Sequence, residues 1–202
     1  MNDSIHQNKF RIILCVILLL IAAVIWSIFL LKDNTPTAAE NSRALIGGPF
    51  NLTNHLNQPV SDKDFLGKYM LVYFGYTYCP DICPMDLQIM ADALDMLDPE
   101  ILEQVSPVFV SVDPERDTYD VMATYVDYFH KDLIGLTGTV DQVEAAKTEY
   151  RVYAEKADDT ENYIVDHTSY TYLMDKDGKF LNHFNHAEDP QKMAAQITAF
   201  VQ

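Results

Sequence analysis

The chain has 202 residues, and its 14 basic and 30 acidic residues leave a formal net charge of −16. An acidic chain of this kind would repel the phosphates of DNA and RNA, which argues against a nucleic-acid-binding function. The hydrophobic fraction of 49% is ordinary for a globular chain with one membrane segment.

The segment from Ile12 to Leu31 contains no charged residue, and its 20 positions match the length of a helix that crosses a bilayer. A cleavable signal peptide is the alternative, but the apolar core of such a peptide has only about 7–15 residues. We therefore predict an uncleaved transmembrane anchor at residues 12–31. Cys15 lies inside this segment, where we expect it to pack as a small hydrophobic side chain.

Basic residues flank the predicted anchor unevenly. Lys9 and Arg11 precede it and Lys32 follows it. The positive-inside rule then predicts a cytoplasmic N-terminal tail, residues 1–11, with the rest of the chain in the periplasm or an equivalent space. The polar residues 32–44 predict a flexible linker that tethers the remaining domain to the membrane.

Residues 45–202 predict one compact domain in which strands and helices alternate. We expect short strands at 50–52 and near Pro59, and then longer strands at 70–74 and 105–112. Helices are expected from Pro84 to about Leu97, from a cap at Asp117 or Thr118 to about His130, and from Val140 to Tyr150. A hairpin at 169–174 and 180–184 and a helix at 190–201 complete the domain. This order predicts a three-layer α/β fold that resembles thioredoxin, with a C-terminal hairpin.

Two cysteines lie just beyond the buried strand at 70–74, in a turn that begins at Gly75. Cys79 and Cys83 each precede a proline, which disfavours helical backbone at both positions. We therefore predict that the next helix begins at Pro84, with Cys83 as its N-cap and Asp86 in its first turn. The helix N-terminus would favour the thiolate form of the cysteine.

The spacing of Cys79 and Cys83 allows several kinds of chemistry. A structural disulfide is disfavoured, because closing so short a loop adds little stability. A zinc site is disfavoured too, since the sequence has no second cysteine pair to complete four ligands. A redox dithiol and a copper site remain.

Six histidines are candidates for a further ligand. His6 lies on the other side of the predicted membrane, and the polar surroundings of His55 and His130 predict solvated side chains. His183 and His186 form a short H-x-x-H pair without further ligands. His167 differs, because a thioredoxin-like arrangement would bring its loop beside the cysteine turn. Local sequence alone favours equally two roles for His167, a metal ligand or a loop histidine bonded to the backbone.

Two thiolates and one imidazole form a soft donor set that suits Cu(I), and also Cu(II) if a water or another ligand completes it. Copper would bind only while both cysteines are reduced and deprotonated. The carboxylates Asp81 and Asp166 could support the metal ligands by hydrogen bonding, but we favour solvated side chains at both positions.

Three segments together resemble the signature blocks of the SCO/SenC family. They are GYTYCPDICP from Gly75 to Pro84, SVDPERDT from Ser111 to Thr118, and DHTSYTYLMDKDG from Asp166 to Gly178. The resemblance extends from Leu45 to the C-terminus. It implies a copper-binding, thioredoxin-like domain with Cys79, Cys83 and His167 as copper ligands, and a role in assembling the dinuclear copper centre of cytochrome c oxidase subunit II. Asp113 lies in the second block and is assigned no metal role.

Other thioredoxin-like families match less well. The chain lacks the C-x-x-C motif of thioredoxins and has Thr168 where they have proline, and Val72 and Tyr76 replace the proline and threonine that peroxiredoxins place before their reactive cysteine. The sequence leaves three functions open: a membrane-anchored copper chaperone, a thiol-disulfide reductase for oxidase or other envelope cysteines, and a copper-dependent redox sensor. The lack of a long Arg- and Ser-rich presequence favours a bacterial inner membrane.

Overall fold

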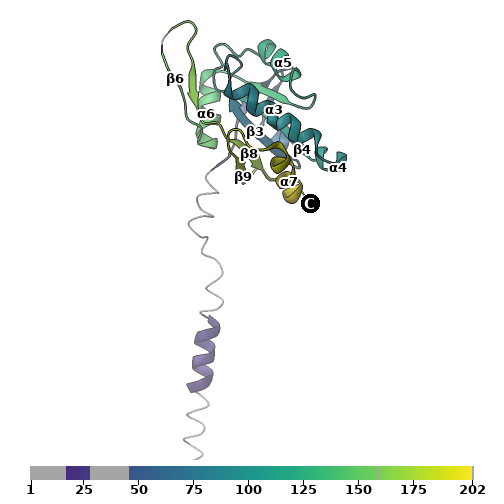
Figure 1. The fold of residues 1–202 in the computed structure, drawn as a ribbon. Helices are drawn as coiled ribbons and strands as arrows, with labels where there is room; N and C mark the ends of the chain where they lie inside the picture. The colour runs from purple at the N-terminus through teal and green to yellow at the C-terminus, as the bar shows by residue number, and fades with distance from the viewer. Residues whose placement is uncertain (1–16, 28–45, 159, 202) are drawn as a thin grey trace, which may run out of the picture. The chain divides into compact units, whose positions relative to one another are not determined.

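The computed structural model describes residues 17–27, 46–158 and 160–201, and the chain divides into two units, residues 1–41 and 42–202. Residues 17–27 are helical (Figure 1). No helix among the described residues is long and apolar enough to cross a membrane. The ends of the predicted anchor at 12–31, the tail at 1–11 and the linker at 32–44 lie outside the described residues.

The described part of the second unit contains one large sheet, one small sheet and several helices (Figure 1). The strands are β1 (Asn51–Asn54), β2 (Pro59–Ser61), β3 (Tyr69–Gly75), β4 (Val105–Ser111), β5 (Ile134–Thr137), β6 (Ala154–Lys156), β7 (Val165–His167), β8 (Thr171–Met174) and β9 (Phe180–Phe184). The helices are η1 (Asp62–Phe65), α3 (Ile82–Asp95), α4 (Pro99–Leu102), α5 (Tyr119–Asp127), α6 (Val140–Tyr150) and α7 (Pro190–Val201).

The large sheet has the strand order β2-β1-β5-β4-β3-β8-β9, and β6 pairs with β7 in a separate hairpin. At its centre β3 runs parallel to β4, with Tyr73 opposite Phe109, and antiparallel to β8. Every residue of β4 is buried, and so is every residue of β3 after Tyr69. Helices therefore cover both faces of these strands, as near-continuous apolar runs require.

Alternate side chains of the central strands pack against different helices. Phe109 stacks on Tyr73 and contacts Tyr125 of α5, whereas Phe74 points the other way and contacts Tyr150 of α6. Helix α7 packs against α3. Gly135 in β5 allows α5 to approach closely, because a Cβ there would lie 2.9 Å from a methyl carbon of Val126. The mixed α/β fold with a central sheet is thus confirmed.

Most predicted elements are present, with differences at their ends. The helix at 140–150, the strand at 180–184 and the helix at 190–201 have the predicted bounds. The predicted cap of α5 is Thr118, whose hydroxyl accepts the Val121 N–H, but this helix ends at Asp127, three residues before His130. Strand β5 was missed, because a four-residue strand containing Gly135 has little strand signal.

The aromatic contacts of Phe109 predict a strong dependence of stability on this side chain. Phe109 is fully buried, so Phe109→Ala should lower the free energy of unfolding by about 3–5 kcal/mol. Urea denaturation followed by circular dichroism would measure the change. The control is Phe200→Ala on α7, where the phenyl ring is 39% exposed and the expected loss is under about 1 kcal/mol. Equal losses in the two variants would contradict the assigned core.

Candidate metal centre

The cysteine turn connects the end of β3 to the start of α3. Cys79 lies in the turn, where its N–H donates to the carbonyl oxygen of Tyr76 at 3.3 Å. The backbone N–H of Cys83 donates to the sulfur of Cys79 at 3.3 Å. The first turn of a helix has N–H groups without intrahelical partners, and one of them thus faces the thiol.

The predicted start of this helix was wrong by two residues. Helix α3 begins at Ile82 with Asp81 as its N-cap, so Cys83 lies inside the first turn and Asp86 in the second. Pro84 is accommodated because a residue so near the helix start needs no N–H for the helical bonding pattern. The preference of residues before proline for extended backbone is overridden here, and the helical position directs Cys83 into the core.

His167 is the last residue of β7, which pairs with β6, rather than part of an open loop. Its Nδ1–H donates to the carbonyl oxygen of Thr168 at 3.0 Å, because a carbonyl can only accept. The other ring nitrogen, Nε2, lies 3.2 Å from the sulfur of Cys83. The ring is held edge-on against Tyr73 and Tyr76.

The structure brings the three predicted ligand residues together. The sulfurs of Cys79 and Cys83 and one ring nitrogen of His167 all lie within 4.8 Å of one another, and both cysteines are free thiols. Among the described residues, this is the one group of three or more histidines, cysteines or carboxylates with the geometry of a metal site. Its two thiols and available imidazole nitrogen match the donors preferred by a soft ion.

The two thiols have different environments. Cys83 is fully buried, and hydrogen bonding to Cys79 together with burial raises the pKa of its thiol. Cys79 is only partly buried. Hydrogen bonding from the Cys83 thiol, followed by His167 and by the N–H groups of Asp81 and Cys83, holds the pKa of Cys79 well below its usual range. Cys79 is thus the thiolate that solvent and a partner can reach.

Gly75 leaves the space that the buried sulfur occupies. A Cβ at this position would lie 2.9 Å from both the Cys83 sulfur and a ring carbon of Tyr73. Any side chain at position 75 would displace Cys83. Glycine is therefore required at the end of β3, because the Cys83 sulfur lies so close to its backbone.

Thr77, which follows Tyr76 at the start of the cysteine turn, is held by a buried carboxylate. Asp117 is fully buried and accepts hydrogen bonds from the Thr77 N–H at 3.1 Å, the Thr77 hydroxyl at 2.6 Å and the Ser111 hydroxyl at 2.6 Å. Burial raises the pKa of Asp117, while these donors oppose that shift. The contact fixes the cysteine turn to the end of β4.

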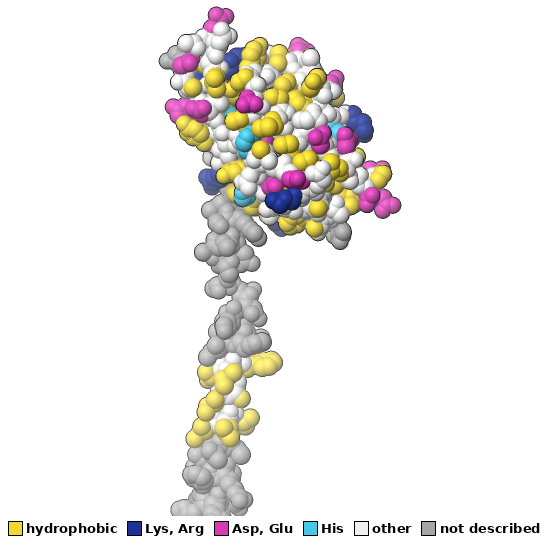
Figure 2. Space-filling view, in the orientation of Figure 1, with side chains coloured by type: hydrophobic (Ala, Val, Ile, Leu, Met, Phe, Trp, Pro, Cys, Tyr) yellow, Lys and Arg dark blue, Asp and Glu magenta, His cyan; other side chains and the backbone are white. Residues whose placement is uncertain are grey.

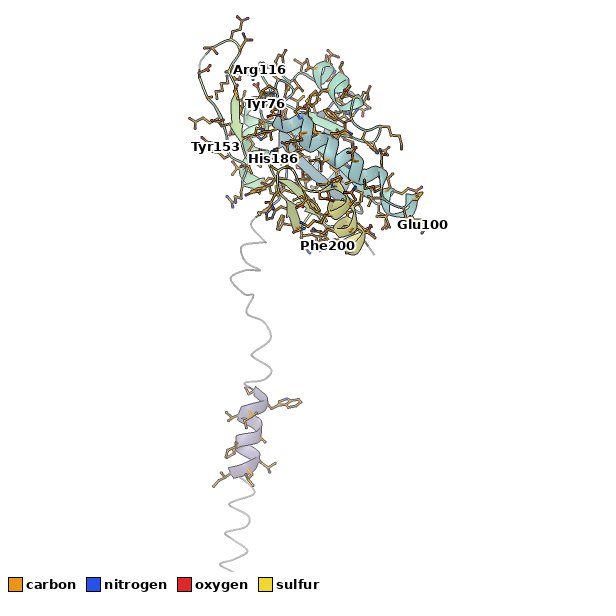
Figure 3. The ribbon with its side chains drawn as sticks, in the orientation of Figure 1. Tyr76, Glu100, Arg116, Tyr153, His186 and Phe200 are labelled. Carbon is orange, nitrogen blue, oxygen red and sulfur yellow. The ribbon has the colours of Figure 1, made fainter. Side chains whose placement is uncertain are left out.

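A second set of contacts fixes the hairpin that carries His167. Arg116 forms an ion pair with buried Asp113, donates to the carbonyl oxygen of Tyr163 at 3.0 Å, and stacks its guanidinium 3.6 Å from the centre of the Tyr163 ring. The N–H of Val165 donates to the hydroxyl of Tyr76 at 3.2 Å. Figure 3 shows Arg116 and Tyr76 next to each other beside this hairpin, and the Arg116 guanidinium lies 5.7 Å from the centre of the Tyr76 ring.

The second signature block therefore contains residues that position the site, a role that the sequence did not reveal. Asp117, Arg116 and Asp113 are separated from both cysteines and His167 in sequence, and only the tertiary structure links them. The signal was the clustering of charged residues soon after a mostly apolar, fully buried strand.

The other described histidines lie elsewhere. The prediction for His130 was wrong: its side chain is buried, and its Nδ1 accepts the Asp132 N–H at 3.2 Å, since α5 ends early and returns the chain into the domain. His55 is also bonded, to the Gly135 N–H at 3.0 Å. His186 contacts Asp86, and His183 packs on the ring of Tyr170, so this pair does not form a site together. Asp81 and Asp166 are exposed, as predicted.

Comparison with known proteins identifies related sequences and structures. A model of the SCO1/SenC family matches residues 38–202. The human mitochondrial protein SCO1 homolog is 44% identical over 158 residues, which cover 77% of this chain and 52% of the human protein. The chain thus matches about half the length of that relative.

Solved structures give the same result. Copper-bound ScoI of Bradyrhizobium japonicum is 41% identical with a TM-score of 0.72, over 77% of this chain and 99% of that one. BsSco is 25% identical with a TM-score of 0.61, over 76% and 92% of the two chains. It is described as having a disulfide switch and as a member of the Sco family of cytochrome c oxidase assembly proteins.

The Asp117 contacts predict that Asp117→Asn disturbs the cysteine turn. The amide NH₂ would face a donor of Thr77 or Ser111, so the free energy of unfolding should fall by about 1–3 kcal/mol. Chemical denaturation measures this loss. Asp120→Asn, an exposed change three residues later, should have almost no effect, and a loss of the same size there would contradict the assignment.

The different environments of the thiols predict selective alkylation. With both thiols reduced, iodoacetamide should modify Cys79 before Cys83, as mapped by peptide mass spectrometry. Because the pKa of Cys79 is lowered, its rate should change little between pH 8 and pH 6, whereas an ordinary thiol slows by about tenfold per unit. Preferential modification of Cys83, or a normal pH profile at Cys79, would contradict the thiolate assignment.

Proposed function

The chain belongs to the SCO1/SenC family, and on this basis we propose that it is a membrane-anchored metallochaperone that delivers copper to the dinuclear centre of cytochrome c oxidase subunit II. Cys79, Cys83 and His167 would hold the metal. The observation that carries this proposal is the convergence of two free thiols and one imidazole nitrogen within 4.8 Å.

The donor set suits the delivery of a soft ion. Thiolate and imidazole ligands favour copper, in particular Cu(I), and Cu(II) could be held if a further ligand completed the site. Copper would displace the protons of both thiols, so an oxidised Cys79 to Cys83 bridge would prevent binding. Cys83, which is buried, and His167 would retain the ion while a thiol of the acceptor replaces the more accessible Cys79.

The membrane location is part of this proposal. A helix spanning residues 12–31, with residues 1–11 in the cytoplasm, would hold the domain on the periplasmic side of a bacterial inner membrane. The apolar sequence of residues 12–31 supports the membrane helix. A related human protein, the SCO1 homolog, is mitochondrial. Tethering both proteins to one membrane would raise the effective concentration of the acceptor.

The different environments of the two thiols support a second function, that of thiol-disulfide reductase. The Cys79 thiolate would attack a disulfide of an envelope protein and form a mixed disulfide, releasing one substrate thiol. Cys83 would then attack the sulfur of Cys79, release the second substrate thiol and leave a Cys79–Cys83 disulfide. A thiol reductant of the envelope would have to restore the pair. A half-exposed thiolate beside a buried thiol is typical of such pairs.

Copper binding by the full chain, purified in detergent under reducing conditions, tests the metal site. We expect one copper per chain, and a loss of affinity of at least about 100-fold in Cys79→Ala, Cys83→Ala and His167→Ala. His183→Ala is the matched control and should bind as the wild type does. Copper K-edge absorption should report two sulfur neighbours and one nitrogen neighbour, and unchanged affinity in His167→Ala would remove that residue from the site.

The same variants separate the two functions in cells. If the protein delivers copper, His167→Ala should lose oxidase activity as Cys79→Ala does. If it acts only as a reductase, His167→Ala should retain oxidase activity while both cysteine variants lose it. Oxidase activity in membranes is the measurement.

A further inference from the structure

A large groove lies beside the candidate metal centre, between α5 and the cysteine turn. Its volume is about 700 Å³, and its apolar lining comes from Tyr78, Pro84, Tyr125, Tyr128 and Phe129. The ring of Tyr128 is 81% exposed and that of Tyr78 is 57% exposed. Figure 2 shows hydrophobic side chains gathered at the end of the domain that carries α5. We call this surface the α5 groove.

The α5 groove is continuous with the metal centre. Tyr78 immediately precedes Cys79, and Pro84 immediately follows Cys83, so the groove wall and the two sulfurs share one turn. A protein bound in the groove would therefore place a neighbouring residue beside Cys79, the accessible thiol. The Arg116 guanidinium lies 4.9 Å from the centre of the Tyr78 ring, yet more than half of the surface of both Tyr78 and Tyr128 stays exposed.

The charges around the groove indicate what can occupy it. Helices α3 and α5 contain no lysine or arginine, and the charged residues at their surface and at the N-cap of α3 are all acidic. Asp120 lines the groove, and the others are Asp81, Asp92, Asp95 and Asp127. The nearest basic side chains are compensated, since Arg116 pairs with Asp113 and Lys131 with Asp132. Two copies of this acidic face would repel each other, which disfavours a homodimer here.

We propose that the α5 groove is the docking site for the copper acceptor, and that the acceptor inserts an apolar or aromatic side chain flanked by basic residues. This inference rests on the function proposed above. An aromatic side chain filling an apolar pocket would supply most of the binding energy, and the acidic rim would speed association and orient the partner.

Binding of the purified soluble domain of the cognate oxidase subunit II, with its cysteines reduced, tests this proposal. The copper-loaded full chain in detergent is titrated with that domain by calorimetry. Tyr128→Ser should raise the Kd at least tenfold, and Asp120→Lys should raise it while weakening its dependence on salt. Copper affinity should be unchanged in both variants, because neither residue touches the metal ligands.

Two controls match these variants. Tyr153→Ser removes an exposed aromatic ring from the β6–β7 hairpin, near the metal centre but outside the groove, and Glu100→Lys reverses a charge on α4, distant from both (Figure 3). Both should bind as the wild type does. A Kd that is unchanged in Tyr128→Ser, or raised equally in Tyr153→Ser, would overturn the groove assignment.

The failure of this inference can be told from failure of the proposed function. If the wild type binds and loads the subunit II domain while Tyr128→Ser does so equally well, only the groove assignment is wrong. If the wild type binds copper but neither binds nor loads that domain, the proposed function fails and the docking proposal fails with it. A dimer in sedimentation velocity that Tyr128→Ser dissociates would identify a second copy as the occupant and overturn the proposal.

Discussion

The buried carboxylate of Asp117 is the constraint on which the site depends. This carboxylate accepts hydrogen bonds from Thr77 at the start of the cysteine turn and from Ser111 at the end of β4. The backbone carbonyl of Asp117 also accepts a hydrogen bond, from the hydroxyl of Thr137 in β5 at 2.6 Å. The cysteine turn is thereby fixed to two neighbouring strands of the sheet. A buried carboxylate without such donors would be costly, so the turn and the carboxylate stabilise each other.

His167 reaches the sulfurs through a different set of contacts, although 84 residues separate it from Cys83. The β6–β7 hairpin is held by Arg116 at Tyr163 and by Tyr76 at Val165, and Arg116 lies directly before Asp117 in the chain. One short segment after β4 therefore positions both halves of the site. This explains why the three candidate ligand atoms lie close together without a metal, an arrangement that lowers the entropic cost of binding.

The sequence predicted the central strands and most helices, because long apolar runs are strong local signals. The cysteine spacing pointed to Cys79 and Cys83, whereas the expectation that His167 lies beside them rested on the family resemblance, and the structure brings the three together. It did not predict that Cys83 lies within a helix, since the proline preference is local and the packing of Cys83 against Gly75 is not. Nor did it predict β5, β6 or the burial of His130. The contacts of Asp117 and Arg116 could not be predicted from sequence either, because their partners Thr77 and Tyr163 lie 40 and 47 residues away.

The surroundings of the sulfurs also determine which ions the site can hold. Burial is the main cause that raises the pKa of Tyr73 and Tyr125, so both phenols stay protonated and cannot act as charged ligands. The carboxylates of Asp113 and Asp117 are already bonded to Arg116, Tyr163, Thr77 and Ser111. These two buried carboxylates are therefore engaged elsewhere, and the donor atoms that converge among the described residues are two sulfurs and an imidazole nitrogen. A site built in this way discriminates against Mg²⁺ and Ca²⁺, which require oxygen ligands, and favours a soft ion whose exchange between proteins proceeds by replacing one thiolate with another.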